Sequence, residues 1–454
     1  MALKKNNSPV RVITVKPAAK VVGAIPAKVV GAVPAKVERR PRITGRLLVR
    51  LNPNVSIELI EKKAKARSLR LIRLRDLPMD GGLSKALEKA DGILFDRLKI
   101  VLVNAGEAGK IKRLLALRDS PFLSSEPERY LYKVAGVKPP VFKNTAAATW
   151  GIQAINVRSS KLTGKDVRIA VLDTGFDFMH PDFAGRVIHR KSFVGRQAKD
   201  REGHGTFCAG IAGGDRKGKS GARYGVAPGV RLYVGKILDD AGEGSDGSAL
   251  AGIEWALEKG CQVISMSFGG AVEAGTAYSE IFEDVAKTAM DNNCLLIAAT
   301  GNESDREEGV IAPINHPANC PSVIAVAALT EGLKVANYSC AGKGGAKRGR
   351  GRGVGAGAGA GRGALAGGAV SATVADVVNI AAPGDNILSA SVGGGYETES
   401  GTSMATPFVA GVAALLWEQH PGASAREIWD KLIGQVLPLG GSVADVGAGM
   451  VYMP

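Results

Sequence analysis

Four continuous apolar runs, separated by helical stretches, restrict the fold of this 454-residue chain more than any other feature. Each run has the length of a buried strand, and the segments between the runs have the apolar spacing of helices. Strands that are apolar on both faces are typical of a parallel sheet, because crossover helices cover both sides of it. The sequence therefore predicts an α/β domain over 148–454, with strands at 166–173, 261–268, 294–300 and 322–328 and helices at 248–259, 279–292 and 402–420.

A smaller α/β unit is expected over residues 43–133. The apolar patterns within it predict strands and helices in alternation. The predicted strands lie at 46–51 and within 93–103, and the predicted helices at 56–68 and 107–117.

Three further segments have compositions that do not suit a packed core. Residues 1–42 contain the Pro-punctuated repeat AKVVGAIP–AKVVGAVP and are expected to form a low-complexity basic arm. Residues 134–147 contain Pro and Lys and are typical of a linker. Residues 341–369, almost all Gly, Ala and Arg, are expected to form a surface insert within the larger domain.

The net charge of +16 is distributed unevenly along the chain. Residues 1–140 contain 30 Lys and Arg against 12 Asp and Glu, and residues 343–362 contain six basic residues and no acidic one. The remainder is acidic, with 23 basic residues against 31 acidic ones. This split favours parts that meet or are removed over a surface that binds a phosphate backbone. The Arg-Gly tract also lacks aromatic residues for stacking on bases, so nucleic acid is not expected as a partner.

Cysteine usage and apolar segments bear on the compartment. Five cysteines with no C-x-x-C spacing argue against zinc, and their odd number leaves one thiol unpaired in a monomer, the expected state. The N-terminus has no apolar core long enough for a secretory signal. No apolar run approaches the roughly 20 residues of a membrane span, so no membrane association is expected. These features favour a cytoplasmic location or a non-classical export route.

Three residues have the chemistry of a nucleophilic hydroxyl and its activating groups. A hydroxyl becomes a nucleophile at neutral pH when a base, an orienting carboxylate and oxyanion donors surround it. Asp173 ends a predicted strand, where α/β sheets place their sites. His204 lies in a Gly-flanked helix start, and Ser403 lies at the start of a long apolar helix, where free N–H groups favour negative charge.

The segments VLDTGFDFMHPDF, GHGTFCAGIAGG and SGTSMATPFVAG resemble the Asp, His and Ser boxes of the subtilisin-like (subtilase) serine peptidase family, in that order. The resemblance extends from about 148 to 450. It implies a three-layer subtilisin-like domain with a mostly parallel central sheet, and a serine endopeptidase that forms an acyl-enzyme on Ser403. Asp173 and His204 would complete the triad, and Asn302 would be the side-chain oxyanion donor.

The same resemblance implies how polypeptide substrates bind. Ser267, Phe268 and Gly269 match the stretch that pairs with an extended substrate, and Ala299, Thr300 and Gly301 match the opposite wall of the first specificity pocket. Because main-chain pairing recognises shape, unfolded or flexible segments are the expected substrates. Asn315 or His316 is a candidate for the floor of this pocket, although an ordinary loop role is favoured for each.

Two features concern the branch of the family and its metal. Cys208, one turn after His204, and the segment LDDAGEGS resemble the proteinase K-like branch, although a small buried hydrophobe is the favoured role for this thiol. Catalysis requires no cofactor. Calcium is the family's usual stabiliser, and Asp182 matches one ligand position, but the segment 218–229 lacks the Asn and Asp residues of the best-known site.

The N-terminal unit, 43–133, resembles in element order the inhibitor-like propeptides of the family, which have a small α/β (ferredoxin-like) fold. The resemblance implies a precursor in which the chain's own propeptide blocks the cleft, with self-cleavage between about 130 and 147. The alternative hypothesis is a catalytically silent subtilase fold that serves as a binding module.

Overall fold

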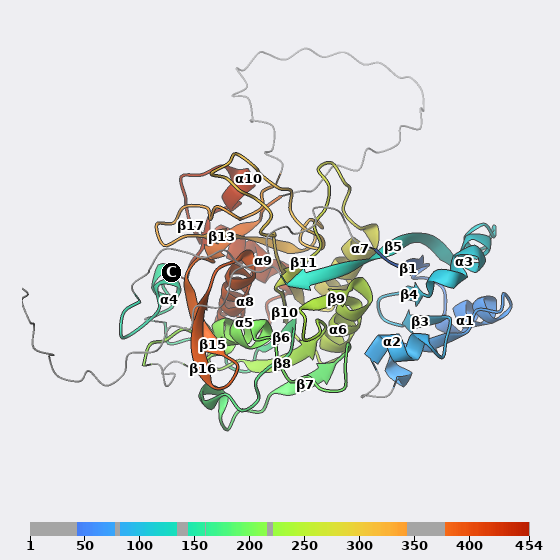
Figure 1. Ribbon diagram of the computed structural model, residues 1–454, viewed down its shortest axis with the longest axis horizontal. Helices are drawn as coiled ribbons and strands as arrows, with labels where there is room; N and C mark the ends of the chain where they lie inside the picture. Colours follow the sequence, from blue (N-terminus) through green and yellow to red (C-terminus); the bar gives the residue numbers. More distant parts are fainter. Residues whose placement is uncertain are drawn as a thin grey trace, which may run out of the picture.

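The computed structural model describes residues 43–77, 82–133, 144–158, 160–215, 221–342 and 377–453. Within these ranges the chain forms a small N-terminal domain and a larger body that pack against each other (Figure 1). The expectations for the arm 1–42, for most of the linker 134–147 and for most of the insert 341–369 lie outside the described residues.

The body is built on a nine-stranded, mostly parallel sheet. In β6 (Arg168–Asp173), Ile169 and Val171 pack on one side of the sheet, and Ala170 and Leu172 pack on the other. Both sides are buried, and this is why the strand is apolar throughout. The order across the sheet is β17 (Val436–Leu437), β18 (Met450–Val451), β14 (Ile380–Pro383), β13 (Ile324–Leu329), β12 (Leu295–Ala299), β10 (Val263–Met266), β6, β8 (Arg231–Lys236) and β7 (His189–Ser192).

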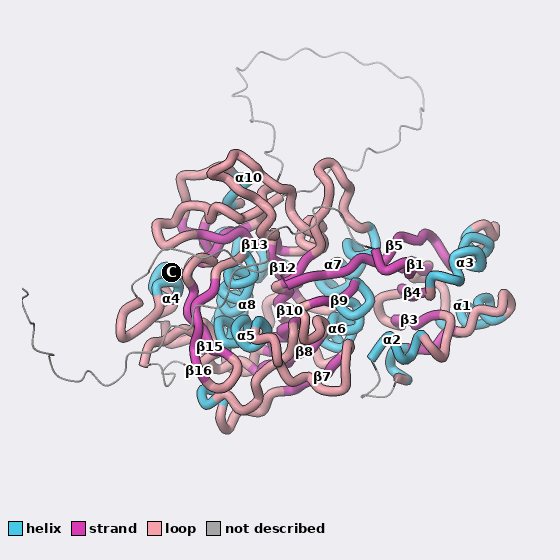
Figure 2. The backbone as a smooth tube through the Cα atoms, viewed as in Figure 1, coloured by secondary structure: helices cyan, strands magenta, loops and turns pink. Residues whose placement is uncertain are grey.

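Helices cover both faces of this sheet, so the predicted three layers are confirmed (Figure 2). One face packs against α5 (His204–Gly213), α8 (Thr402–Gln419) and α9 (Ala425–Gly434), and the other against α6 (Asp246–Glu258) and α7 (Glu280–Asp291). Among the described residues, no helix combines the length and apolarity needed to cross a bilayer. The remaining elements are α4 (Trp150–Ala154), η3 (Pro181–Phe183), α10 (Val443–Val446), β9 (Glu243–Ser245), β11 (Phe268–Gly269) and the hairpin β15 (Ile387–Ser391) and β16 (Gly395–Glu399).

The N-terminal domain has the strand order β5-β1-β4-β3-β2. Its strands β5, β1, β4 and β3 pair antiparallel, with α1 after β1 and α3 after β4, which is the predicted ferredoxin-like arrangement. Its elements are β1 (Ile43–Leu51), α1 (Ile57–Lys65), β2 (Leu71–Arg73), η1 (Leu74–Asp76), α2 (Gly82–Leu87), β3 (Gly92–Phe95), β4 (Ile100–Val103), η2 (Ala105–Glu107), α3 (Ala108–Leu115) and β5 (Phe122–Lys133).

The two faces of the small sheet have different partners. One face packs against α1 and α3 in a core of its own, which includes Val49 and Ile60. The other face joins the core of the body beside α6 and α7. Leu102 on β4 lies so close to the first turn of α6 that a side chain at Gly247 would collide with it. The N-terminal domain therefore docks on the two helices through apolar contact as well as through polar groups.

The longest strand of the small domain, β5, is absent from the sequence-based prediction. Its sequence, FLSSEPERYLYK, contains a proline and two glutamates and has no continuous apolar run. The strand forms because it pairs with β1 on one side and then extends beyond its own domain into the body, where it pairs with β9 and β11 (Figure 1). Tertiary pairing, and not local propensity, determines this element.

Candidate functional site

The site lies at the carboxyl edge of the central sheet, where β6 ends and α5 begins. Asp173 is the last residue of β6, and its Oδ1 lies 2.8 Å from Nδ1 of His204, the first residue of α5. Both side chains are buried. Burial by itself opposes protonation of the imidazole, but the Asp173 carboxylate outweighs it, so the pKa of His204 lies well above its ordinary value.

Ser403 lies beside this pair in the first turn of α8, as its helix-start sequence predicts. Its hydroxyl donates to the carbonyl oxygen of Ser267 at 3.0 Å, and the Ser267 hydroxyl donates back to the Ser403 carbonyl at 2.8 Å. Within the described ranges, His204 Nε2 is buried and has no hydrogen-bond partner. The structure thus brings the three predicted residues to one site, but the hydrogen bond expected between Ser403 and His204 is not formed in it.

Asn302 is tied to the residue that precedes Ser403. Its amide oxygen accepts from the backbone N–H of Thr402 at 2.9 Å and from the Thr402 hydroxyl at 3.0 Å. This anchoring fixes the orientation of the amide, whose nitrogen is the donor that an oxyanion role requires. The Asn302 side chain therefore links the loop after β12 to the first turn of α8.

The two predicted substrate walls follow the ends of β10 and β12. The strand predicted over 261–268 is interrupted at Ser267, and β11 (Phe268–Gly269) pairs antiparallel with β5, Phe268 opposite Lys133 and Gly269 opposite Tyr132. On its other edge β5 pairs with β9, Leu131 opposite Gly244. An extended segment of the chain itself thus lies where a substrate strand was expected.

Between the two walls lies Asn315, for which the sequence favoured an ordinary loop role over a place near the pocket floor. Asn315 is buried, its Nδ2 donates to Glu303 Oε1 at 3.1 Å, and Cys340 Sγ lies 3.2 Å from the other carboxylate oxygen. A Cβ added to Gly301, whose φ is +113°, would lie 2.7 Å from the Asn315 side chain, and one added to Gly269 would lie 3.0 Å from it. Asn315 therefore fills the space between the walls.

Comparison with known proteins identifies the family. A family model described as the subtilase family, peptidase S8, matches residues 164–449. The chain is 33% identical to subtilisin E of Bacillus subtilis over 294 residues, which is 64% of this chain and 66% of that protein. It is also 33% identical to the subtilisin of Bacillus pumilus over 294 residues, and this match covers 91% of the relative. The chain belongs to the subtilase family.

Two solved structures extend this similarity. Sphericase, 28% identical, aligns with 67% of this subtilase and 98% of its own chain with a TM-score of 0.54. Fervidolysin from Fervidobacterium pennivorans, a keratinolytic enzyme related to subtilisin, aligns with 92% of this chain and 61% of its own at a TM-score of 0.64, and its 23% identity shows the fold alone. The relatives of this subtilase indicate a serine endopeptidase and do not favour the catalytically silent alternative.

At the candidate calcium position, this subtilase has other partners for the carboxylate. Asp182 Oδ2 accepts from the hydroxyls of Tyr224 and Tyr396, each at 2.7 Å. Burial, together with the bond to Asp182, raises the pKa of Tyr224 above its ordinary range, so this hydroxyl remains a neutral donor. Calcium needs about six to eight oxygen ligands, and the described part of the neighbouring loop, residues 221–229, contains no acidic residue. The described residues at this position do not fit a calcium ion.

Cys208 contacts both halves of the site. Its Sγ lies 3.9 Å from His204 Nδ1 and 3.6 Å from the Ser403 carbonyl oxygen. Burial raises the pKa of this thiol to about 11, so it is neutral at physiological pH. The small buried hydrophobe favoured by the sequence agrees with this environment, and the proteinase K-like character stays a prediction.

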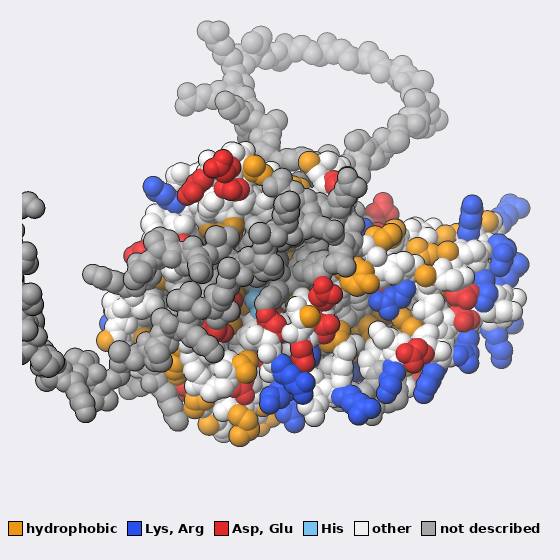
Figure 3. Space-filling model, viewed as in Figure 1, with side chains coloured by type: hydrophobic (Ala, Val, Ile, Leu, Met, Phe, Trp, Pro, Cys, Tyr) orange, Lys and Arg blue, Asp and Glu red, His pale blue; other side chains and the backbone are white. Residues whose placement is uncertain are grey.

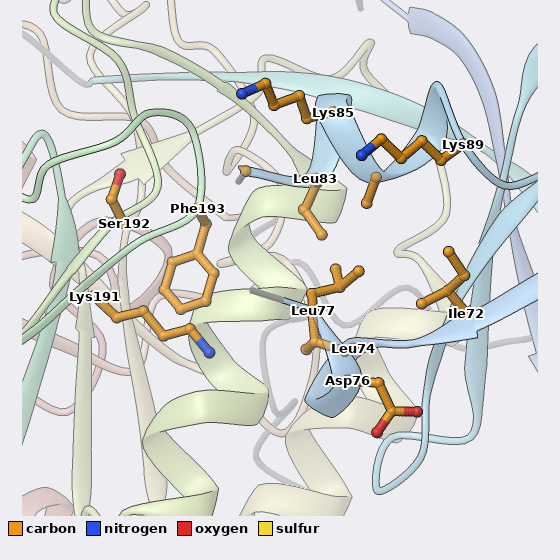
Figure 4. A pocket seen from close by; sticks show the side chains of 12 residues that line it. Ile72, Leu74, Asp76, Leu77, Leu83, Lys85, Lys89, Lys191, Ser192 and Phe193 are labelled. Carbon is orange, nitrogen blue, oxygen red and sulfur yellow. The ribbon is translucent and has the colours of Figure 1, made fainter. Parts of the chain in front are cut away.

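A cavity of about 430 Å³ lies away from the triad, between the N-terminal domain and the body (Figure 4). Its apolar lining comes mainly from the N-terminal domain, including Leu74, Leu77 and Leu83, and it is closed by Phe193 of the body. It belongs to the docking interface and contributes nothing to the chemistry at Ser403.

Proposed function

We propose that the chain cleaves polypeptides by acyl transfer to Ser403 and that residues 43–133 are its propeptide. The observation that carries the first part is the buried hydrogen bond between Asp173 and His204 beside a serine at a helix N-terminus. Asp173 would hold the tautomer in which Nδ1 carries the proton, and Nε2 would then take the proton of the attacking hydroxyl and later give it to the leaving amine. Asn302 Nδ2 and the backbone N–H of Ser403 would bind the oxyanion.

Substrate binding itself would prepare the nucleophile. The carbonyl oxygen of Ser267 accepts a hydrogen bond from the Ser403 hydroxyl. Ser267 directly precedes Phe268 and Gly269 in the predicted substrate wall. A substrate N–H that pairs with this carbonyl competes with the hydroxyl for it. Displacement favours rotation of the hydroxyl toward His204 Nε2, and such catalytic hydrogen bonds often tighten only in the substrate complex.

The position of β5 supports the propeptide role. The strand lies between β9 and β11 and ends opposite Phe268, one residue from the carbonyl that holds the Ser403 hydroxyl. While it is there, no other strand can pair with those edges. Because β5 ends opposite Phe268, the residue after Ser267, we place the self-cleavage shortly after Lys133, within the predicted window of 130–147.

Two carboxylates of β5 strengthen the docking by meeting helix N-termini. Glu128, fully buried, accepts from the backbone N–H of Gly247 at 2.8 Å in the first turn of α6 and from Arg46 of its own domain. Glu126 accepts from the hydroxyl of Ser279, which caps α7. Free N–H groups at a helix N-terminus favour negative charge, so the helices add to the stabilisation of each glutamate only when the domain is docked.

A third carboxyl group at the interface, that of Glu254, is favoured in its protonated form when the domain is docked. Glu254 on α6 accepts one bond, from the Arg97 N–H at 3.1 Å, and its other oxygen is buried with no partner among the described residues. Burial raises the pKa of Glu254 to about 7 despite this bond. Asp96, whose Oδ1 is likewise buried without a partner in that part of the chain, has its pKa raised by burial against Arg75 and Arg73.

The first test is labelling of Ser403 by a fluorophosphonate probe. We expect labelling of the processed protein and none of a Ser403→Ala variant, because only a hydroxyl with a neighbouring base and oxyanion donors reacts efficiently. Mass spectrometry of the labelled peptide locates the site. Processed protein that stays unlabelled would support the binding-module alternative.

Self-processing is tested by N-terminal sequencing of the purified wild-type chain beside Ser403→Ala. The wild type should begin within residues 134–147, and the variant should keep its original N-terminus, because the same hydroxyl performs the cut. Identical processing of both chains would exclude self-cleavage and assign the cut to another protease.

The first specificity pocket should be short, because Asn315 fills it. We expect a peptide library to be cleaved after small residues, and Asn315→Gly should shift the preference toward larger apolar ones by on the order of 10-fold to 100-fold in kcat/KM. Asn319→Gly, in the same loop, is the control. An unchanged preference in Asn315→Gly would place the pocket elsewhere.

Docking of the N-terminal domain should weaken between about pH 4.5 and pH 7. A carboxyl whose pKa is raised on docking binds a proton more tightly in the docked state, so docking is strongest below the undocked pKa and loses this contribution as pH rises through about 7. Hydrogen exchange of β11 amides in the uncleavable Ser403→Ala chain, expressed as protection factors, measures this. Protection should fall on the order of 100-fold across the window and should become nearly independent of pH when Glu254→Gln is added. Equal pH dependence in both chains contradicts the assignment.

A further inference from the structure

A buried lysine lies at the same sheet edge as the catalytic aspartate. Lys236 is the last residue of β8, directly opposite Asp173 in the parallel register of β6 and β8, and only 4% of it is exposed. Its ammonium donates to the carbonyl oxygen of Thr174 and lies 2.9 Å from Oδ1 of Asp240, a half-exposed residue. Neither Lys236 nor its contacts belong to the triad, the oxyanion donor or the substrate walls.

The Thr174 peptide that this lysine holds is connected to both Asp173 and the helix of His204. The Thr174 N–H donates at 2.7 Å to Asp173 Oδ1, the same oxygen that faces the imidazole. Its hydroxyl accepts from the N–H of Gly205 at 2.9 Å, in the first turn of α5. One residue thus fixes the direction of the carboxylate and the start of the helix that carries the base, and Lys236 binds the carbonyl oxygen of that residue.

A buried ammonium group at this place destabilises the folded state through its loss of hydration. Removing an ion from water costs several kcal/mol, and apolar residues of similar volume often replace buried ions without loss of stability. A side chain needed only to close the sheet edge would be better as methionine. Because the charge lies at the strand end opposite Asp173, a buried carboxylate that has one oxygen, Oδ2, without a partner among the described residues, a role in the chemistry explains it better than a role in packing.

We propose that Lys236 is a positioning residue of the catalytic site: it holds the Thr174 peptide, and through it the Asp173 carboxylate, in the orientation that His204 requires, and its charge opposes protonation of the imidazole. The inference rests on the proposed peptidase function. Among the described residues, the titratable and charged groups that bond to His204 or to Thr174 are Asp173 on β6, Cys208 on α5, Glu202 and Asp200 in the loop before α5, and Lys236 on β8. Lys236 is the one cation in this set.

The test compares variants of the full chain after self-processing, with kcat and KM measured on an unstructured peptide over a range of pH. Concentrations are taken from end-point fluorophosphonate labelling. Lys236→Met should lower kcat on the order of 10-fold to 100-fold with KM unchanged, because a misplaced base slows the chemistry and leaves the substrate walls intact. The acid limb of kcat/KM should move to higher pH, since the imidazolium loses a repelling charge.

Three further variants separate the contributions. Lys236→Arg, which keeps the charge and the donor, should restore most of kcat and the wild-type limb. Lys236→Gln keeps a neutral donor but loses the charge. The acid limb of its kcat/KM should therefore move to higher pH, and at pH values above this limb its kcat should fall less than that of Lys236→Met. Asp240→Asn removes the surface ion pair and keeps the bond to Thr174, so both kcat and the limb should match the wild type.

The outcomes separate a positioning role of Lys236 from a purely structural role and from a failure of the proposed peptidase function. Wild-type kcat and an unmoved limb in folded Lys236→Met would overturn the proposal, and so would a change confined to the melting temperature, which indicates a structural role. If Lys236→Met does not fold, an unshifted limb in Lys236→Gln overturns it. Absence of activity in the wild-type chain would contradict the proposed peptidase function, and it is distinguishable because all variants would then be equally inactive.

Discussion

The hydrogen bond between Asp173 and His204 is the interaction to which the rest of the architecture is adjusted. It joins the end of a strand to the start of a helix, so it needs a sheet whose strands all end at one edge and crossover helices that return to that edge. A parallel sheet supplies both. The continuous apolar sequence of β6 and its neighbours is the condition for such a sheet, and it therefore also determines where the site lies.

The site is arranged in a resting state around this bond. Ser403 and Ser267 exchange two hydrogen bonds, and β5 pairs with β9 and with β11, which belongs to the predicted substrate wall. These two observations have one cause, because Ser267 ends β10 and immediately precedes β11, the short strand that β5 covers. The nucleophile and the substrate groove are thus controlled at the same interruption of one strand.

The parts of the structure that sequence predicts are those fixed by local pattern. Four strands and three helices of the body and the helix-start positions of His204 and Ser403 follow from apolar spacing and local sequence, and the structure has them, with the strand predicted over 261–268 interrupted at Ser267. For Asn315 the sequence favoured a loop role, because its place between the walls depends on Glu303 and on two glycines brought together by folding. The same reason applies to β5, whose partners β9 and β11 lie more than a hundred residues later in the chain.

The buried contacts at the interface do not follow from the net charges of its two parts. A basic domain against an acidic body suggests attraction between opposite charges, and Lys and Arg do gather on the outer surface of the N-terminal domain (Figure 3). Arg50, which contacts Asp284 at 2.5 Å, follows this rule. The buried contacts do not, because Glu126 and Glu128 of the basic domain meet helix N-termini.

Net charge and buried contacts therefore act at different stages. Long-range attraction acts between net charges across solvent and speeds encounter. Helix N-termini act only within about one turn, so they fix the register in which β5 enters the cleft. The carboxylates of β5 determine the position in which the domain docks, and the surrounding lysines and arginines speed its encounter with the body.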